Sequence, residues 1–350
     1  MIPSISFVKL NNMKMRLFLP LSAFAALSVC LMLSSCAGGG RAGGGRAVTD
    51  DPAAESRRFP LVEVPGVIVD REEAAEYLGL HYWDSFTDTA EVHACDSMRV
   101  NGVTRSEVEQ KFADYTGLIG ALGRSRASRS AERLYDRAEA FERAHSSSDL
   151  FETVVSLAQK YWYDPNSPLR DEELYLVFAE RLALYDGFSD AERDRYAHDA
   201  AMCSLNRPGD KAADFFFSDA SGNVMNLYGI EAEYLILFFS NPGCEACAGM
   251  VRALDAEPVR RLVKEGRLAV VNIYIDEDVA SWHSHLSDYP SIWYNGYDPN
   301  LVIRTDLLYN VRAIPSVYVL DGDKRVILKD ATDAALTSFI SGLLRTQSRR

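Results

Sequence analysis

The apolar run YLILFF at residues 234–239 is followed closely by the turn residues Asn241-Pro242-Gly243 and by two cysteines, Cys244 and Cys247. A short, continuous apolar run that ends in turn residues is typical of a strand buried on both faces. Such strands occur in sheets that carry helices on both sides, so the run predicts an α/β domain. Asn-Pro-Gly ends the strand, and we expect a helix from Cys244.

The remainder of residues 206–350 supports the prediction of an α/β domain. RLAVVNIYI (267–275) predicts a second buried strand, and the run 214–227 predicts a hairpin that turns at Ser221-Gly222. A second hairpin is expected over 315–330 with its turn at Asp321-Gly322, followed by a closing helix over 333–344. The alternation predicts a mixed central sheet with flanking helices.

Residues 59–205 have a different pattern of apolar residues. Apolar residues recur at three- and four-residue spacing, as in Val108, Phe112, Tyr115 and Ile119, which predicts an all-α domain. This domain shows no metal-ligand spacing, phosphate loop or nucleophile motif, so its function is open. His81, Trp83 and Trp162 are candidates for lining a groove, but core or rim packing is the expected fate of such residues.

The N-terminus is typical of a secretory signal. A short basic start precedes an apolar stretch from Leu17 to Leu33, and LSSC (33–36) resembles the lipobox of bacterial lipoproteins. We therefore expect residues 1–36 to be a lipoprotein signal with Cys36 lipidated, and the glycine-rich residues 37–58 to be a flexible tether. The alternative is an ordinary cleaved signal with a free cysteine. The lipobox implies a lipid-anchored protein of the bacterial cell envelope. No acidic residue directly follows Cys36, which by resemblance to lipoprotein sorting rules favours the outer membrane, facing the periplasm.

The mature chain would be strongly acidic. Lys9, Lys14 and Arg16 leave with the signal and no acidic residue does, so the formal charge changes from −13 to −16. This charge argues against nucleic acid as a partner and against electrostatic adhesion to anionic lipid. The expected membrane contact is the lipid anchor alone.

Four cysteines remain once Cys30 leaves with the signal and Cys36 carries lipid. Disulfides persist in the envelope, so Cys95 and Cys203 are a candidate structural disulfide; the alternative is two buried, unpaired thiols. The sequence has no second CxxC, and a closed zinc site needs about four ligands. We therefore expect no metal.

The combined features of residues 207–344 resemble the thioredoxin fold, and most closely the membrane-anchored TlpA/ResA-type thiol-disulfide oxidoreductases. The features are an opening hairpin, a buried strand, a CxxC that begins a helix, and Ile314-Pro315 before a final hairpin. The helical domain resembles an uncharacterised domain that precedes such modules in bacterial lipoproteins.

The resemblance implies a redox-active Cys244–Cys247 pair with no other cofactor. Cys244 would be the nucleophile at a helix N-terminus, and Cys247 the resolving thiol. Pro315 matches the family's cis-proline, beside which the Ile314 backbone binds an extended substrate peptide. The implied partners are envelope protein thiols or disulfides and an unidentified electron donor or acceptor protein. The Glu-Ala dipeptide within the CxxC favours a reductase over an oxidase.

Two departures from the family leave questions open. Gly243 stands where the prototype has tryptophan, and Phe238 replaces the buried acid that helps to move protons for Cys247. Glu245 and Asp276 are the candidates for that acid's role, although a solvated role suits both.

Two other functions compete with the oxidoreductase. One is a non-enzymatic envelope module in which the cysteine pair is inert and the two domains bind a protein partner. The other is a peroxidase of the peroxiredoxin kind, which the sequence disfavours because FFSNPGC (238–244) lacks the required threonine.

Overall fold

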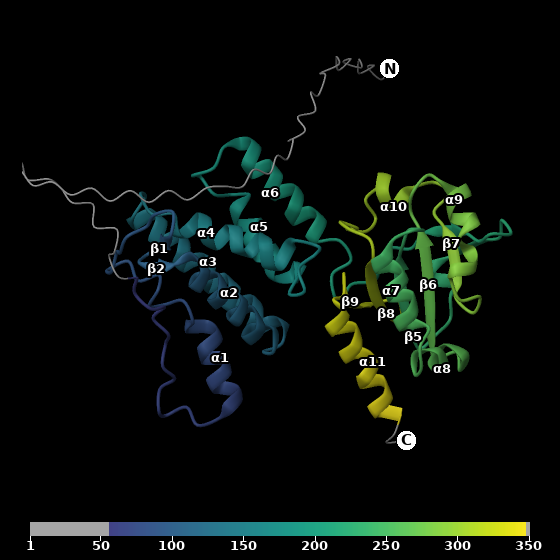
Figure 1. The fold of residues 1–350 in the computed structure, drawn as a ribbon, viewed down its shortest axis with the longest axis horizontal. Helices are drawn as coiled ribbons and strands as arrows, with labels where there is room; N and C mark the ends of the chain where they lie inside the picture. Colours follow the sequence, from purple (N-terminus) through teal and green to yellow (C-terminus); the bar gives the residue numbers. More distant parts are fainter. Residues whose placement is uncertain (1–55, 348–350) are drawn as a thin grey trace, which may run out of the picture. The chain divides into compact units, whose positions relative to one another are not determined.

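The structure is a computed structural model that describes residues 56–347, with side chains through Arg345 (Figure 1). The predicted signal, the predicted lipidation site Cys36 and most of the predicted tether lie outside the described residues. Among the described helices, none combines the length and the apolar character needed to cross a membrane.

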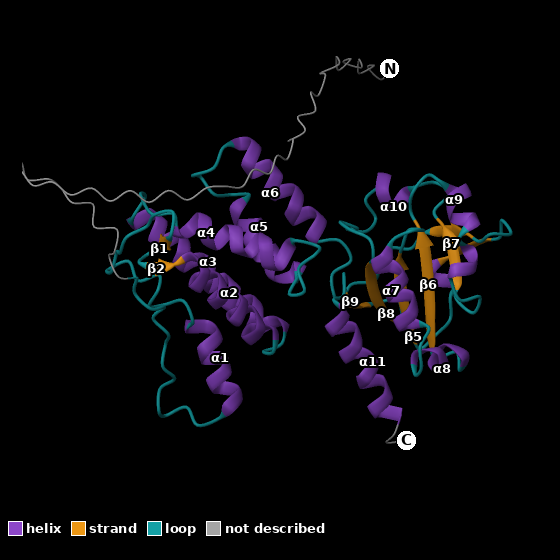
Figure 2. Ribbon diagram, viewed as in Figure 1, coloured by secondary structure: helices purple, strands orange, loops and turns teal. Residues whose placement is uncertain are grey.

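The first part of the described chain is helical, as predicted (Figure 2). Its elements are α1 (Arg71–His81), α2 (Arg105–Gly120), α3 (Arg124–Ala144), α4 (Leu150–Ala158), the π-helical turn η1 (Gln159–Tyr163), α5 (Glu172–Leu182) and α6 (Asp190–Cys203). Side-chain caps define several of the helix starts. Asp70 accepts from two backbone N–H groups of α1, and Ser189 forms a reciprocal capping box with Glu192 at α6.

A short hairpin interrupts the helices and was not predicted. Strands β1 (Arg99–Val100) and β2 (Val103–Thr104) pair antiparallel around Asn101-Gly102. Both turn residues have positive φ, 45° and 79°, which suits Asn-Gly in a two-residue hairpin turn.

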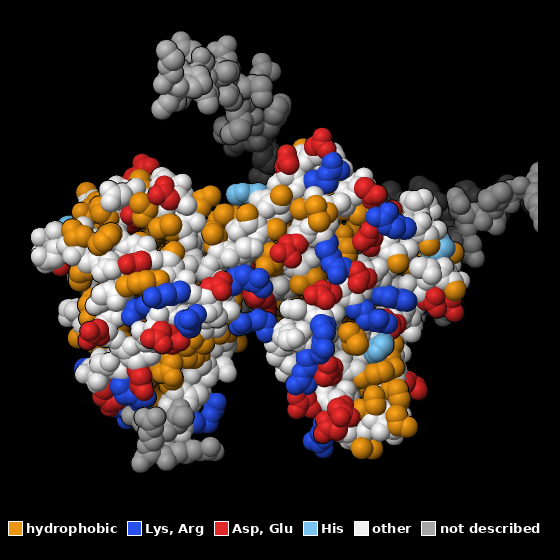
Figure 3. Space-filling view, turned by 180° about the vertical axis from the view of Figure 1, so that it is seen from behind, with side chains coloured by type: hydrophobic (Ala, Val, Ile, Leu, Met, Phe, Trp, Pro, Cys, Tyr) orange, Lys and Arg blue, Asp and Glu red, His pale blue; other side chains and the backbone are white. Residues whose placement is uncertain are grey.

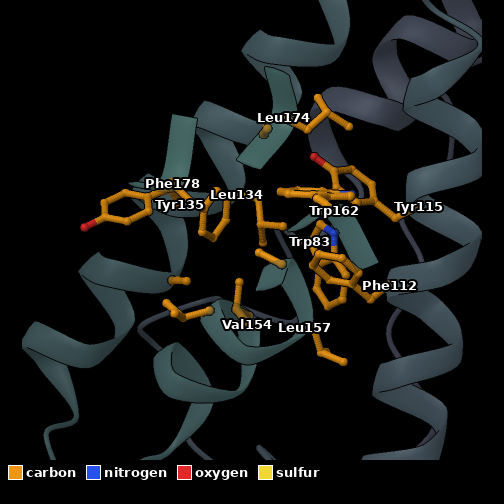
Figure 4. Packing of buried hydrophobic residues seen from close by; sticks show 14 of the residues in the cluster. Trp83, Phe112, Tyr115, Leu134, Tyr135, Val154, Leu157, Trp162, Leu174 and Phe178 are labelled. Carbon is orange, nitrogen blue, oxygen red and sulfur yellow. The ribbon is translucent and has the colours of Figure 1, made fainter. Parts of the chain in front are cut away.

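The core of the helical part is aromatic (Figure 4). Trp83 and Trp162 are 2% and 0% exposed, and the Trp162 indole N–H donates to Thr116 Oγ1 at 2.9 Å. Phe112 and Phe178 pack against Trp162 with ring centroids 4.9 and 5.3 Å away. These tryptophans therefore belong to the core and line no groove.

The second part is a seven-stranded mixed sheet in the order β4-β3-β7-β6-β5-β8-β9. Strands β5, β6 and β7 are parallel, and the other pairs are antiparallel. The strands are β3 (Phe216–Ser218), β4 (Val224–Asn226), β5 (Tyr234–Phe239), β6 (Leu268–Tyr274), β7 (Tyr294–Tyr297), β8 (Ser316–Asp321) and β9 (Val326–Leu328). The helices are α7 (Glu245–Leu254), α8 (Val259–Lys264), α9 (Val279–Ser284), α10 (Val302–Thr305) and α11 (Asp333–Gln347), with short 3₁₀ turns η2 (Leu227–Gly229) and η3 (Leu286–Asp288).

Strand β5 contributes to a core on each face of the sheet, which confirms the prediction from YLILFF. Leu235, Leu237 and Phe239 pack in one core with Ile303 of α10. Ile236 and Phe238 pack in the other, where α7, α8 and α11 cover the sheet. Both predicted hairpins and the closing helix are also present.

The described residues belong to one compact unit, although its cores fall on either side of residues 204–211. Its acidic and basic side chains are interspersed over the face seen in Figure 3. Many form exposed ion pairs, such as Arg129 with Glu76 at 2.7 Å. Such pairs contribute little to stability individually.

Candidate active site

Strands β5 and β8 bring two distant segments of the sequence together. Phe239, the last residue of β5, lies opposite Ser316, the first residue of β8. The CxxC follows β5 and Ile314-Pro315 precedes β8, so both segments lie at the same end of this strand pair. The register therefore assembles the four residues predicted for the site.

Cys244 caps the N-terminus of α7. Its backbone is extended, with φ −81° and ψ 113°, and its Sγ accepts the backbone N–H of Cys247 at 3.2 Å. The turn before it contains Gly243 at φ +74°, a conformation that favours glycine. The half-buried sulfur at this position lies at the positive end of the helix dipole, which favours negative charge.

Cys247 has a different environment one turn later. It is 2% exposed, and burial raises the pKa of its thiol to about 12, with the hydrogen bond to Cys244 acting in the same direction. Cys247 therefore holds its proton at neutral pH. This division suits an accessible attacking thiol and a shielded resolving thiol.

The Ile314 backbone lies close to Cys244. Its carbonyl oxygen is 3.8 Å from Cys244 Sγ, and the Ile314–Pro315 peptide bond is cis, as the resemblance implied. Both residues are half-buried.

Tyr289 is a site residue that the sequence analysis missed. It lines the cleft beside Cys244 and Cys247, and burial raises the pKa of its hydroxyl, so the phenol stays neutral at physiological pH. Ser240 Oγ lies 3.5 Å from this hydroxyl and donates to Asn272 Oδ1 at 2.5 Å. A lone tyrosine between a 3₁₀ turn and a proline carries no sequence signal that would place it in this cleft.

Of the two carboxylates considered as proton acceptors, one is exposed and the other is already paired. Glu245 is exposed on the first turn of α7. Asp276 is engaged by the Asn241 side-chain amide and pairs with Arg304. Phe238, at the position of the family's acid, is fully buried in the apolar core beside Cys247.

Cys95 and Cys203 do not form the candidate disulfide. Both are free thiols in the structure, and different groups surround them. Cys95 Sγ lies 3.2 Å from Ser148 Oγ, whereas Cys203 is fully buried and the pKa of its thiol is raised by burial and then by the charge of Glu172. The alternative of unpaired thiols therefore describes this structure. Within the described part of the chain, no three His, Cys, Asp or Glu residues are grouped so that they could hold a metal ion.

Comparisons with known proteins cover both parts of the chain. A family described as a domain of unknown function (DUF5106) matches residues 44–206. A crystal structure of a thioredoxin-like protein from Bacteroides caccae is 35% identical, covers 81% of this chain and 98% of its own, and has a TM-score of 0.71. This similarity confirms the predicted fold class.

Two shorter structures also match. The C-terminal domain of an uncharacterized Bacteroides fragilis protein is 43% identical, covering 39% of this chain and 98% of its own with a TM-score of 0.38. A conserved Bacteroides fragilis protein of unknown function is 36% identical, covering 38% and 98% with a TM-score of 0.38. None of the curated proteins matches the chain.

The environments of the two thiols predict their order of reaction. In the reduced protein at neutral pH, iodoacetamide should label Cys244 at least about tenfold faster than Cys247, because a thiol whose pKa is about 12 is almost entirely protonated. Peptide mapping after short labelling times measures both rates. In denaturant the two rates should converge, and preferential labelling of Cys247 in the folded protein would contradict the assignment.

Proposed function

Because the chain belongs to the thioredoxin-like proteins, we propose that it is a thiol-disulfide oxidoreductase that exchanges disulfides with protein thiols through Cys244 and Cys247. The observation that carries this proposal is the position of Cys244 Sγ. It lies between the Cys247 N–H at 3.2 Å and the Ile314 carbonyl at 3.8 Å. The first contact stabilises a thiolate, and the second places a peptide-binding backbone beside it.

The different environments of Cys244 and Cys247 define the order of steps in the proposed disulfide exchange. The Cys244 thiolate attacks one sulfur of a substrate disulfide, and the other substrate sulfur leaves as a thiolate, which gives a mixed disulfide. Cys247 then loses its proton and attacks Cys244 Sγ, so that the second substrate sulfur leaves. Two electrons pass to the substrate, and the chain retains a Cys244–Cys247 disulfide. A dithiol protein of the envelope restores the pair by the reverse exchange.

The proposed direction is reduction of substrate disulfides. Its support is the Glu245-Ala246 dipeptide inside the CxxC, which resembles the Glu-Pro of ResA-like reductases. This mechanism requires no cofactor besides the redox-active cysteine pair.

Trapping experiments distinguish the enzyme from an inert module. Cys247→Ser should accumulate mixed disulfides between Cys244 and envelope proteins, because no nearby thiol remains to release them. Cys244→Ser is the matched control and should trap none. Non-reducing gels of envelope extracts measure both. Equal, negligible trapping in the two variants would support the non-enzymatic alternative.

The proposed location is the outer membrane, facing the periplasm, with a lipid on Cys36 and residues 37–58 as the tether. The support is the LSSC motif after a basic and apolar leader. Mass spectrometry of the N-terminal peptide should find a lipidated Cys36, and Cys36→Ser should release the protein from membrane fractions. An unmodified Cys36 thiol in the mature protein would contradict the anchor.

A further inference from the structure

A buried cluster of five charged side chains joins the helical part to the sheet part. We call Arg170, Glu172, Arg312, Lys329 and Asp330 the charge cluster. Their side chains are between 3% and 16% exposed. Charged side chains are rarely buried to this degree unless they are paired, because burial costs each ion its hydration. The cluster therefore requires both parts of the chain to remain in place.

Glu172, the first residue of α5, is the centre of this cluster. Its Oε1 accepts from Asn310 Nδ2 at 3.0 Å and from Arg312 Nε at 2.9 Å. Its Oε2 lies 2.7 Å from Lys329 Nζ, and that ammonium also donates to the Cys203 carbonyl at the end of α6. One carboxylate of the helical part thus engages three residues of the sheet part.

Asp330 is the second carboxylate of the charge cluster. It accepts from Arg170 Nε at 3.1 Å, from Arg312 Nη2 at 3.1 Å and from Ser316 Oγ at 3.1 Å. Arg312 is therefore shared between two buried carboxylates, and its guanidinium also lies 4.3 Å from the centre of the Tyr163 ring. This side chain has little freedom to move.

The residues that the charge cluster engages flank the substrate-binding backbone. Asn310 and Arg312 precede Ile314-Pro315, and Ser316 follows it directly. Arg312 is two residues from Ile314, so their Cα atoms are at most about 7 Å apart. The segment 310–316 is thus fixed at both ends, and the Ile314 carbonyl lies between the fixed points, 3.8 Å from Cys244 Sγ.

We propose that Glu172 is a positioning residue for disulfide exchange, and that the helical part serves to hold the segment 310–316 against Cys244. This inference rests on the proposed function and gives the helical part a role in it. Glu172 does not touch the cysteines, so it acts through Arg312 and Asn310 on the Ile314 backbone. A protein substrate needs that backbone to align its disulfide, whereas a small disulfide reagent needs only an accessible Cys244.

The test compares two oxidants with the full chain. Glu172→Gln should slow the reduction of insulin disulfides by about tenfold, because displacement of a substrate-aligning group costs one to two orders of magnitude in rate. Its reaction with 2,2′-dithiodipyridine, a small disulfide, should stay within about twofold of the wild type, since Cys244 keeps its N-cap position. The ratio of the two rates separates positioning from a general loss of structure.

Glu173→Gln is the matched control. Glu173 is adjacent in α5, but its ion-pair partner is Arg207 of the connecting residues 204–211, at 2.8 Å, and not a residue of the segment 310–316. This variant should reduce insulin at the wild-type rate. If Glu172→Gln fails to fold, Asn310→Ala decides instead, because it removes one hydrogen bond from an uncharged side chain to Glu172 and leaves the ion pairs. It should slow insulin reduction selectively, by a smaller factor.

Three outcomes would overturn the inference. Unchanged insulin reduction in the folded Glu172 variant would show that the carboxylate does not position the site. An equal loss with both oxidants would show a general structural role. A wild-type protein that reacts with 2,2′-dithiodipyridine but does not reduce insulin would contradict the proposed function and this inference with it.

Discussion

The antiparallel pairing of β5 with β8 is the constraint on which the site depends. Phe239 opposite Ser316 fixes where the CxxC turn begins and where the Ile314-Pro315 segment ends. The register is determined by burial on both faces of β5. A one-residue slip would exchange the two faces, moving Phe238 away from the core that shields Cys247. The contact between Cys244 and Ile314 is thus a consequence of how the central strands pack.

The two cysteines lie within one turn of α7 in different environments, which supports the different roles that we propose for them. Cys244 is at the helix end, where backbone N–H groups favour the thiolate, while Cys247 faces apolar side chains and keeps its proton. In the proposed exchange, this arrangement favours the first attack and makes the second depend on loss of the Cys247 proton. Phe238 offers no acceptor, and the ionisable side chains that line the cleft with both sulfurs are Arg252, Asp288 and Tyr289. In our proposal the helical part contributes through Glu172, which holds the segment 310–316 beside Cys244.

The sequence predicted those features that depend on local pattern. YLILFF, the two hairpins and the CxxC after Asn-Pro-Gly each carry a signal within a few residues, and all were confirmed as structural elements. The hairpin at Asn101-Gly102 had such a signal and was overlooked. Strand β7 had almost none, because YNGY is short, and Gly296 is required where Phe217 packs: a Cβ there would lie 2.5 Å from the Phe217 ring.

The features that the sequence did not predict depend on contacts between residues that are far apart in the chain. Glu172 lies in an acidic stretch at a helix start, where acidic residues are ordinary, and its partners Asn310 and Arg312 are 138 and 140 residues away. Cys95 and Cys203 looked like a pair because of the expected oxidising compartment. Their separate surroundings are set by tertiary packing, which cysteine counts do not specify.

The reduction potential of the Cys244–Cys247 pair tests the central claim most directly. Equilibration of the full chain against dithiothreitol or glutathione buffers, with the thiols counted by alkylation, should give a reversible two-electron couple near thioredoxin's value of roughly −270 mV. A potential below roughly −300 mV, as structural disulfides have, would contradict the account. So would a pair that does not exchange with the buffer.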